Sequence, residues 1–414
     1  MKNKNAPSGV FGLLLPEIGR AVSEAGYKIP SPIQRKTIPS LLEGRDMLGC
    51  AQTGTGKTAA FMLPILQYLA KNKKHSAAKK PRVLILAPTR ELAAQIRDSA
   101  ARYGKYTRTT HAVIFGGVGQ NPQVIAMRRG VQVLVATPGR LIDLVNQKHI
   151  DLAEVEIFVL DEADRMLDMG FIHDIRKIIA MLPKKRQSLF YSATMEPKVI
   201  ELARTLVHNP VHVTIAPKKP AVECIVQKVM FVSKENKDDL ITDLLKSEKM
   251  DRVMVFVQMK HIANHVARKL ELAGISAAAI HGNKSQTART RALADFKAGK
   301  TRVLVATDIA ARGIDVDSIS HVINYNMPVE PETYVHRIGR TARAGSDGDA
   351  ISFCCAPERN YLHAIEKLIR TNIPVDFKHA FHCEKSKNAT GADAKPAPRG
   401  QRNRGRRPPR GRGK

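Results

Sequence analysis

Residues 51–58, with the sequence AQTGTGKT, combine residue types that can hold phosphate groups. Gly54 and Gly56 would let backbone N–H groups wrap phosphate oxygens, beside a helix N-terminus that adds positive potential. Lys57 can reach β- and γ-phosphates, and the Thr58 hydroxyl can hold Mg²⁺. An apolar run precedes the segment and a helical pattern follows it, which is the setting of a phosphate-binding loop.

An acidic pair follows a second apolar run, residues 157–160. A carboxylate at the carboxyl end of a parallel strand lies in the ligand crevice of an open α/β sheet. Asp161 is therefore placed to hold Mg²⁺, and Glu162 to orient and deprotonate an attacking water. Acidic residues are also common at helix N-termini, so the pair predicts a catalytic site only because a phosphate loop lies upstream.

A cationic cluster lies far along the chain, in the run HRIGRTAR at residues 336–343. Arginines at positions i, i+3 and i+6 fall near one face of a helix. Such a cluster can supply arginine fingers to a γ-phosphate across a cleft. The alternative is an exposed basic helix that binds only RNA.

Short β-branched runs alternate with helical patterns along the chain, which predicts an α/β fold with parallel sheets. A proline-rich stretch interrupts the alternation and divides it into two series. Strands are expected at 47–50, 83–87, 113–115, 131–136, 157–160 and 189–191, and then at 253–257, 276–280, 303–306, 322–325 and 350–354. The predicted domains are 1–209 and 223–383, with a linker at 210–222 and a disordered basic tail at 384–414.

The charge balance predicts a polyanionic partner. The 414 residues carry a net charge of +29, and the tail, with 11 basic and 2 acidic residues, accounts for +9 of it. The tail lacks large apolar residues and is expected to tether RNA nonspecifically or to act as a solubilising end. No apolar run approaches the roughly 18 residues that span a bilayer, so we expect no membrane partner. Five scattered cysteines indicate a reducing cytoplasm without a disulfide partner.

These motifs, in this order, resemble the DEAD-box ATP-dependent RNA helicase family, and the resemblance extends over about residues 10–370. The runs MGFIHDIR from 169 and IHGNKSQ from 280 are similar to the bacterial RhlE-type subgroup. The resemblance implies two RecA-like parallel-sheet domains in tandem with a cleft between them. It also implies ATP and Mg²⁺ as cofactors and RNA as the partner, bound with little sequence preference.

The resemblance carries over nucleotide contacts to specific positions. Gln34 would pair with adenine, Asp315 would hold the ribose, and either Phe11 or Tyr27 would stack near the base. The remaining nucleotide contacts would come from Thr53, Gly54, Thr55, Gly56, Lys57 and Thr58.

Coupling and RNA contacts also follow from the resemblance. His336 would link across the cleft to Asp164 and Ser192, with Thr194 in the same coupling motif. RNA contacts would come from Pro88, Thr89, Arg90, Gly116, Gly117, Thr137, Pro138, Gly139, Arg140, Gln286, Arg289, Thr307, Asp308, Arg312 and Gly313. The resemblance also makes Arg340 and Arg343 the arginine fingers, and Ala342 stands where the family has glycine.

The sequence thus predicts a bacterial cytoplasmic enzyme that couples RNA-stimulated ATP hydrolysis to local, non-processive unwinding or remodelling of RNA duplexes and RNA–protein complexes. Two alternatives remain open, a DNA helicase of the same superfamily and an RNA chaperone that anneals strands through its charge. Ribosome precursors and RNA-decay machinery are both compatible partners.

Overall fold

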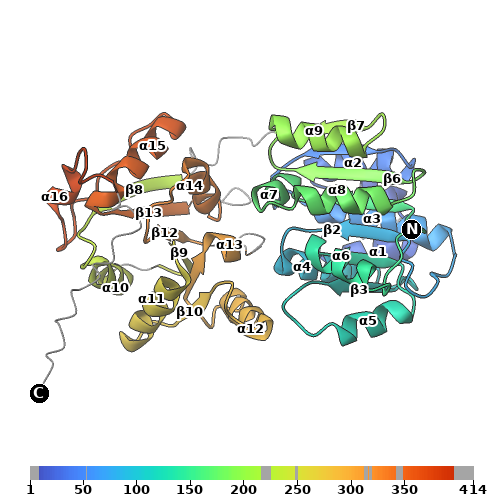
Figure 1. The fold of residues 1–414 in the computed structure, drawn as a ribbon, viewed down its shortest axis with the longest axis horizontal. Helices are drawn as coiled ribbons and strands as arrows, with labels where there is room; N and C mark the ends of the chain where they lie inside the picture. Colours follow the sequence, from blue (N-terminus) through green and yellow to red (C-terminus); the bar gives the residue numbers. More distant parts are fainter. Residues whose placement is uncertain are drawn as a thin grey trace, which may run out of the picture.

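The computed structural model describes residues 9–52, 54–215, 225–247, 250–311, 316, 319–341 and 348–395. Two separate sheets dominate it, and Figure 1 shows each sheet flanked by its own helices. Every pairing between named strands of the described residues is parallel. The two-domain α/β fold predicted from the alternating pattern is confirmed.

Sheet A has seven strands in the order β3-β4-β2-β5-β6-β1-β7. Strands β4, β2 and β5 are apolar at every position because both faces of the sheet are covered there, and alternate residues point to opposite faces. In β2, for example, Val83 and Ile85 belong to one core cluster, whereas Leu84 and Leu86 belong to the other. The strands are β1 Met47–Cys50, β2 Val83–Leu86, β3 His111–Ile114, β4 Val133–Ala136, β5 Ile157–Leu160, β6 Gln187–Ser192 and β7 Val211–Thr214.

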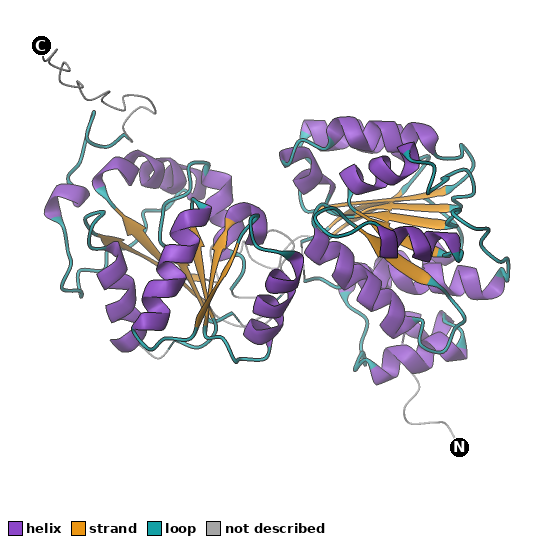
Figure 2. Ribbon diagram, turned by 60° about the horizontal axis from the view of Figure 1, so that its bottom comes forward, coloured by secondary structure: helices purple, strands orange, loops and turns teal. Residues whose placement is uncertain are grey.

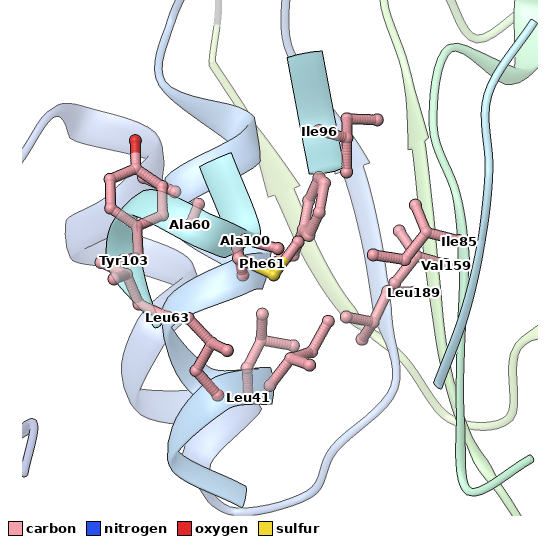
Figure 3. Packing of buried hydrophobic residues seen from close by; sticks show 14 of the residues in the cluster. Leu41, Ala60, Phe61, Leu63, Ile85, Ile96, Ala100, Tyr103, Val159 and Leu189 are labelled. Carbon is pink, nitrogen blue, oxygen red and sulfur yellow. The ribbon is translucent and has the colours of Figure 1, made fainter. Parts of the chain in front are cut away.

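The helices of the first domain form a layer on each face of sheet A, as the core clusters show. Phe61 lies fully buried on α3, among Ile96, Ile85 and Leu189 (Figure 3). One layer holds the 3₁₀ helix η1 Gly9–Leu13 with α1 Pro16–Glu24, α2 Pro32–Leu42, α3 Lys57–Lys71 and α4 Arg90–Tyr103. The other holds α5 Asn121–Arg128, α6 Pro138–Asn146, α7 Ala163–Asp168, α8 Ile172–Met181 and α9 Pro197–Leu206.

Sheet B has six strands in the order β10-β11-β9-β12-β13-β8, again with helices on both faces (Figure 2). The strands are β8 Ile225–Phe231, β9 Val253–Val257, β10 Ala277–Ile280, β11 Val303–Thr307, β12 His321–Asn324 and β13 Gly348–Cys354. The helices are α10 Lys237–Ser247, α11 Lys260–Leu272, α12 Gln286–Lys297, α13 Asp308–Ala311, α14 Pro331–Ile338, α15 Arg359–Ile369 and α16 Glu384–Lys387, with the 3₁₀ helix η3 Ala356–Glu358.

The predicted linker at 210–222 was too long. Val211–Thr214 forms β7, which pairs in parallel with β1 at the edge of sheet A. The alternation of its side chains is weak, because an edge strand is covered less than a central one, and the prolines downstream hid it from the sequence pattern. Residues 216–222 lie outside the described residues.

The predicted disordered tail also began too early. Up to residue 395 the chain packs on the second domain: Val375 forms a bridge with Val229, and Cys383 N–H donates to Phe231 O at 3.0 Å. Ser386 is buried and donates to Val232 O at 3.0 Å. This segment covers the exposed edge of β8, the last strand of sheet B. Residues 396–414, with all of the tail's arginines, lie outside the described residues.

The core packing of α3 predicts a large destabilisation by Phe61→Ala. Removing a fully buried phenylalanine costs about 3–5 kcal/mol through lost apolar contact and the cavity that remains. We expect a clearly lower urea midpoint in far-UV circular dichroism. Ile125→Ala, at a side chain that is 49% exposed in the same domain, serves as the control. Equal midpoints for the two variants would contradict the packing of α3.

Candidate nucleotide and nucleic-acid site

The phosphate loop connects β1 to α3, as the sequence predicted. Gly54 and Gly56 adopt φ values of +83° and +90°, which side chains rarely tolerate. Lys57 begins α3 and is buried, and Thr58 follows it on the same turn. The Thr55 hydroxyl donates to Gln52 O at 2.8 Å, which closes the loop on itself. Thr53 lies outside the described residues.

Gln34 is locked against this loop. Its amide Nε2 donates to Gly56 O at 3.2 Å, and its Oε1 accepts from Ser31 N–H at 2.8 Å. A Cβ on Gly56 would lie 2.6 Å from Gln34 Nε2, so glycine is required there for space as well as for conformation. Each amide atom of Gln34 keeps one further hydrogen-bonding capacity. Its pairing with adenine therefore stays a prediction, and its contact with the phosphate loop is a role the sequence did not reveal.

The two aromatic candidates for the adenine differ in exposure. Phe11 is 1% exposed and packs edge-on against Tyr27, with ring centroids 6.4 Å apart. Tyr27 is half-buried, and its hydroxyl hydrogen-bonds the Tyr103 hydroxyl at 2.9 Å. Of the two rings, Tyr27 keeps the surface that a base could contact, and Phe11 supports it from the core.

Lys57 and Asp161 form the polar centre of the site. The Lys57 Nζ lies 3.9 Å from the Asp161 Oδ1, too far for a hydrogen bond, and both side chains are buried. Neither atom has a hydrogen-bond partner within the described part of the chain. Burial raises the pKa of Asp161 to about 6, although Lys57 acts in the opposite direction. Buried polar groups without partners are costly, so this pair fits a ligand that brings anionic oxygens to the lysine and a cation to the carboxylate.

Glu162 is held in a strained conformation beside Asp161. Its φ of +56° lies in the left-handed region, where a non-glycine residue costs about 1–3 kcal/mol and often marks a functional site. The carboxylate Oε2 accepts from Arg165 Nη1 at 2.8 Å and is buried. The Arg165 guanidinium holds the carboxylate of this strained residue in place.

Asp164 ties this motif to the end of β6. Its Oδ2 accepts from the backbone N–H groups of Ala193 and Thr194 at 3.0 and 3.1 Å. The Ser192 hydroxyl in turn accepts from Asp164 N–H at 3.3 Å. The three coupling residues predicted in the first domain therefore come together as one hydrogen-bonded unit.

His336 and Arg340 lie on or just beyond α14 in the second domain. Partial burial and the guanidinium groups of Arg165 and Arg340 lower the pKa of His336, whereas Asp164 acts in the opposite direction. Because Asp164 and Arg165 belong to the first domain, His336 lies close to the coupling unit across the junction. The expected hydrogen bond from His336 to Asp164 or Ser192 is not among the contacts of the described residues. Arg340 is buried, and Arg343 lies outside the described residues.

Arg337 is a site residue that the sequence reasoning missed. It donates to both carboxylate oxygens of Asp308, at 2.6 and 2.8 Å, and its Nη1 donates to Asn324 Oδ1 and Asn326 O. The pair anchors Asp308, which follows β11, to α14. The predicted contact of Asp308 with RNA stays a prediction. The available signal was that Arg337 is the first of the three spaced arginines in the basic run 336–343.

The loops of the first domain that carry the predicted RNA contacts, here called the RNA-type loops, meet at one edge of sheet A. They follow β2, β4 and β3, which are neighbours in the sheet, so the loops adjoin. The Thr89 hydroxyl caps α4 by accepting from Leu92 N–H at 3.3 Å, and Pro88 precedes it. Thr137 occupies the N-cap position of α6 without a side-chain capping hydrogen bond, and the first turn of α6 is Pro138, Gly139 and Arg140.

Arg90 joins two of these loops. Gly116 and Gly117 follow β3, and the Arg90 guanidinium packs directly on Gly117, where a side chain would collide with it. Arg140 donates to Val118 O at 3.4 Å from both terminal nitrogens. Burial lowers the pKa of Arg90, as do the charges of Arg289 and Arg140, and Glu91 opposes them. Three guanidinium groups gathered in this way favour an anionic ligand.

The second domain reaches this edge through the start of α12. Gln286 Nε2 donates to Glu91 Oε1 at 3.2 Å, and Arg289 Nη2 lies 2.9 Å from the same oxygen. Arg90 Nη1 donates to Gln286 Oε1 at 3.5 Å. Gln286 and Arg289 were predicted to contact RNA; the structure brings them to Arg90 and adds Glu91, which the sequence reasoning did not select. Thr307 ends β11 in the same domain, and Arg312, Gly313 and Asp315 lie outside the described residues.

A phosphate loop, an acidic strand end and a second parallel-sheet domain define a two-domain nucleoside-triphosphate-binding protein. Residues 31–202 match the family model for DEAD/DEAH box helicases, and residues 236–345 match the model for the helicase conserved C-terminal domain. The chain belongs to the DEAD/DEAH box helicase family.

Similar proteins agree with this assignment. The chain is 44% identical over 359 residues to the ATP-dependent RNA helicase DeaD of Mycobacterium tuberculosis, covering 86% of this chain and 62% of that protein. It is 41% identical over 368 residues to DEAD-box ATP-dependent RNA helicase CshA of Streptococcus pneumoniae, covering 88% and 69%. A structure of S. cerevisiae Dbp5 bound to RNA and ADP BeF3 is similar with a TM-score of 0.75 and 34% identity, covering 88% of this chain and 94% of that one.

The chain spans less than two thirds of the length of the Mycobacterium tuberculosis relative. In the described residues, none of the helices is long and apolar enough to cross a bilayer.

The contact between Gly56 and Gln34 predicts different effects for two matched substitutions. Gly56→Ala and Gly54→Ala both force alanine into a left-handed conformation, at about 1–2 kcal/mol each. Only Gly56→Ala also drives a methyl group into Gln34, because nothing lies within 4 Å of the Gly54 Cβ position. Without nucleotide, Gly56→Ala should therefore lower the melting temperature more than Gly54→Ala. Equal losses, or a larger loss for Gly54→Ala, would contradict this packing.

Proposed function

We propose that this protein is an ATP-dependent RNA helicase that couples RNA-stimulated ATP hydrolysis to local, non-processive opening of RNA duplexes and remodelling of RNA–protein complexes. The observation that carries the proposal is the junction of Glu91 with Gln286 and Arg289. It joins the RNA-type loops of the first domain to the second domain, and the first domain also carries a nucleotide site whose central polar atoms have no partners among the described residues.

Lys57, Thr58 and Asp161 would hold ATP and Mg²⁺ on the first domain. The ion would neutralise charge on the phosphates and orient them for attack. Lys57 donates toward phosphate oxygens, and Asp161 and Thr58 offer oxygen ligands. Glu162, whose backbone is strained, accepts a proton from the attacking water.

The second domain would complete the site. Arg340, with Arg343, would stabilise the negative charge that develops on the phosphates, as arginine fingers do. His336 lies close enough to the Asp164 unit for its charges to act on it, so nucleotide occupancy can be sensed across the junction. Either ligand then favours the same closed arrangement, and ATP and RNA bind cooperatively.

RNA would be held through phosphates and 2′-hydroxyls. The starts of α4 and α6, each with threonine at the N-cap position, offer backbone N–H groups, and Arg90, Arg140 and Arg289 offer positive charge. None of these contacts reads base edges, so sequence preference should be low. The basic residues after 395 would add a nonspecific tether.

Several finer assignments rest on resemblance. We propose a bacterial cytoplasmic setting, supported by the bacterial relatives, and partners among ribosome precursors or RNA-decay machinery. The RhlE-type subgroup stays a prediction.

Glu162→Gln tests the catalytic assignment. It keeps the shape of the side chain but removes the base, so ATP hydrolysis with RNA should fall by about 10²–10⁴-fold. RNA binding in the presence of ATP should persist, measured by fluorescence anisotropy. Glu201→Gln, at an exposed carboxylate on α9, should leave both quantities unchanged.

Assays of ATP hydrolysis and duplex unwinding with RNA or DNA test whether the protein is an RNA helicase. Wild-type hydrolysis should rise with RNA and rise little with DNA, and an RNA duplex but not an all-DNA duplex should be unwound. A rate of ATP hydrolysis that is the same with and without RNA would refute the proposal. Strand annealing that survives Lys57→Ala would instead identify a chaperone that acts through its charge.

The Glu91–Arg289 pair predicts energetic coupling between the domains. Glu91→Ala, Arg289→Ala and the double variant form a cycle, read out as RNA affinity with a non-hydrolysable ATP analogue. A buried pair should show a coupling of about 1–3 kcal/mol. The exposed pair of Arg176 and Glu201 within the first domain should show about 0–1 kcal/mol. Additive single effects at Glu91 and Arg289 would show that the pair does not join the domains.

A further inference from the structure

A second cavity opens on the first domain, away from the site described above. Its volume is about 600 Å³, within the roughly 300–1,000 Å³ of small-molecule pockets. It is lined by the segments that precede β2, β3 and β4, whereas the phosphate loop and the RNA-type loops follow the strands. Parallel strands separate these two edges, so the cavity is not part of the nucleotide or RNA site.

The cavity has an apolar floor and a cationic rim. Its apolar lining is Leu15, Ile18, Leu69 and Ala70, and because Ile18 and Leu69 are fully buried, Leu15 and Ala70 supply the apolar surface that a ligand can touch. Exposed Lys73, Arg108 and Arg129 line its rim, each from a different connecting segment.

These three cations are uncompensated among the described residues. None of them has an acidic partner within ion-pair distance there, whereas neighbouring Lys74 lies 3.4 Å from Glu154. Glu17 is the single acidic residue among those that line the cavity. The rim therefore keeps a net positive charge.

The lysine-rich segment 71–81, between α3 and β2, is fixed beside the cavity. Arg82, which is 1% exposed, donates from Nη1 to Asn72 O and Lys74 O at 2.8 and 3.1 Å and pairs with Glu156 at 2.8 Å. Gly130 packs so closely that a Cβ there would lie 2.6 Å from Ser76 O.

The same loop brings a polar group without a partner to the cavity wall. The Ser76 hydroxyl is buried, and no hydrogen-bond partner exists for it in the described part of the chain. A buried hydroxyl without a partner is costly, so a ligand that hydrogen-bonds it would be favoured.

We propose that this cavity binds a phosphate-bearing nucleotide unit, with its base or sugar on the aliphatic floor and its phosphate on Lys73, Arg108 and Arg129. The unit can come from an unpaired RNA segment that extends beyond the main site, or from a free nucleotide. The RNA source rests on the proposed function, and the free-nucleotide source does not.

A charge-matched pair of variants of the full chain tests the proposal. The cavity variant is Lys73→Ala/Arg108→Ala/Arg129→Ala. The control, Lys177→Ala/Lys198→Ala/Arg204→Ala, removes three exposed charges from α8 and α9 of the same domain. Both variants lose the same net charge, so a difference between them reports the cavity and not general attraction.

Two probes distinguish the sources. If RNA is the ligand, a labelled 20-nucleotide strand should bind the cavity variant more weakly than the control. Its salt slope should shrink by about 2, at about 0.7 per phosphate contact, and a 6-nucleotide strand should be unaffected. If a free nucleotide is the ligand, labelled GDP should bind wild type while an ATP analogue saturates the main site, and the cavity variant should lose that binding.

Identical behaviour of the two variants toward both probes would overturn the proposal. RNA-stimulated ATP hydrolysis with the 6-nucleotide strand reports the proposed function separately and should be the same in both variants. If the 6-nucleotide strand does not stimulate ATP hydrolysis, the helicase function is refuted. The binding of GDP to the cavity can still be interpreted in that case.

Discussion

The ion pair between Glu91 and Arg289 is the interaction on which the composite site depends. Each sheet by itself ends in loops that could hold part of a ligand, but neither holds a complete site. The pair is buried where the two domains meet, so opening the domains would break a direct contact between opposite charges. Gln286 and Arg90 extend the contact into a small polar network that joins α4 to α12. The charge pairing thus fixes which edges of the two sheets meet.

The residues of the nucleotide site lie at the carboxyl ends of the strands, and several of them are in states that destabilise the fold. Within the part of the chain that the structure describes, Lys57 and Asp161 keep buried atoms without partners, and Glu162 adopts a left-handed conformation. A bound ligand can offset the free-energy cost of such features, and for this reason they indicate a functional site. The surrounding contacts supply the rigidity. Asp164 holds the end of β6, and Arg337 holds Asp308. The amino ends of the same strands carry a different surface, where Arg82 fixes a basic loop beside a cavity.

Much of this arrangement could be predicted from the sequence because the relevant signals are local. The buried strands β1, β5 and β9 read as continuous apolar runs, and the phosphate loop has its own spacing. The edge strand β7 and the docked segment up to residue 395 were missed because their order comes from tertiary pairing with β1 and β8. Glu91, Arg337 and the contact of Gln34 with Gly56 were missed for a related reason. Which partner a charged or amide group finds is decided by residues far away in the chain.

The central claim is that ATP and RNA favour one closed arrangement of the two domains. The most direct measurement is a thermodynamic cycle by titration: the affinity for a short RNA with and without a non-hydrolysable ATP analogue, and the affinity for the analogue with and without RNA. The account predicts that each ligand tightens the other by the same factor, as linkage requires, and that Arg289→Ala reduces this factor. Affinities for RNA and nucleotide that are independent of each other would contradict it.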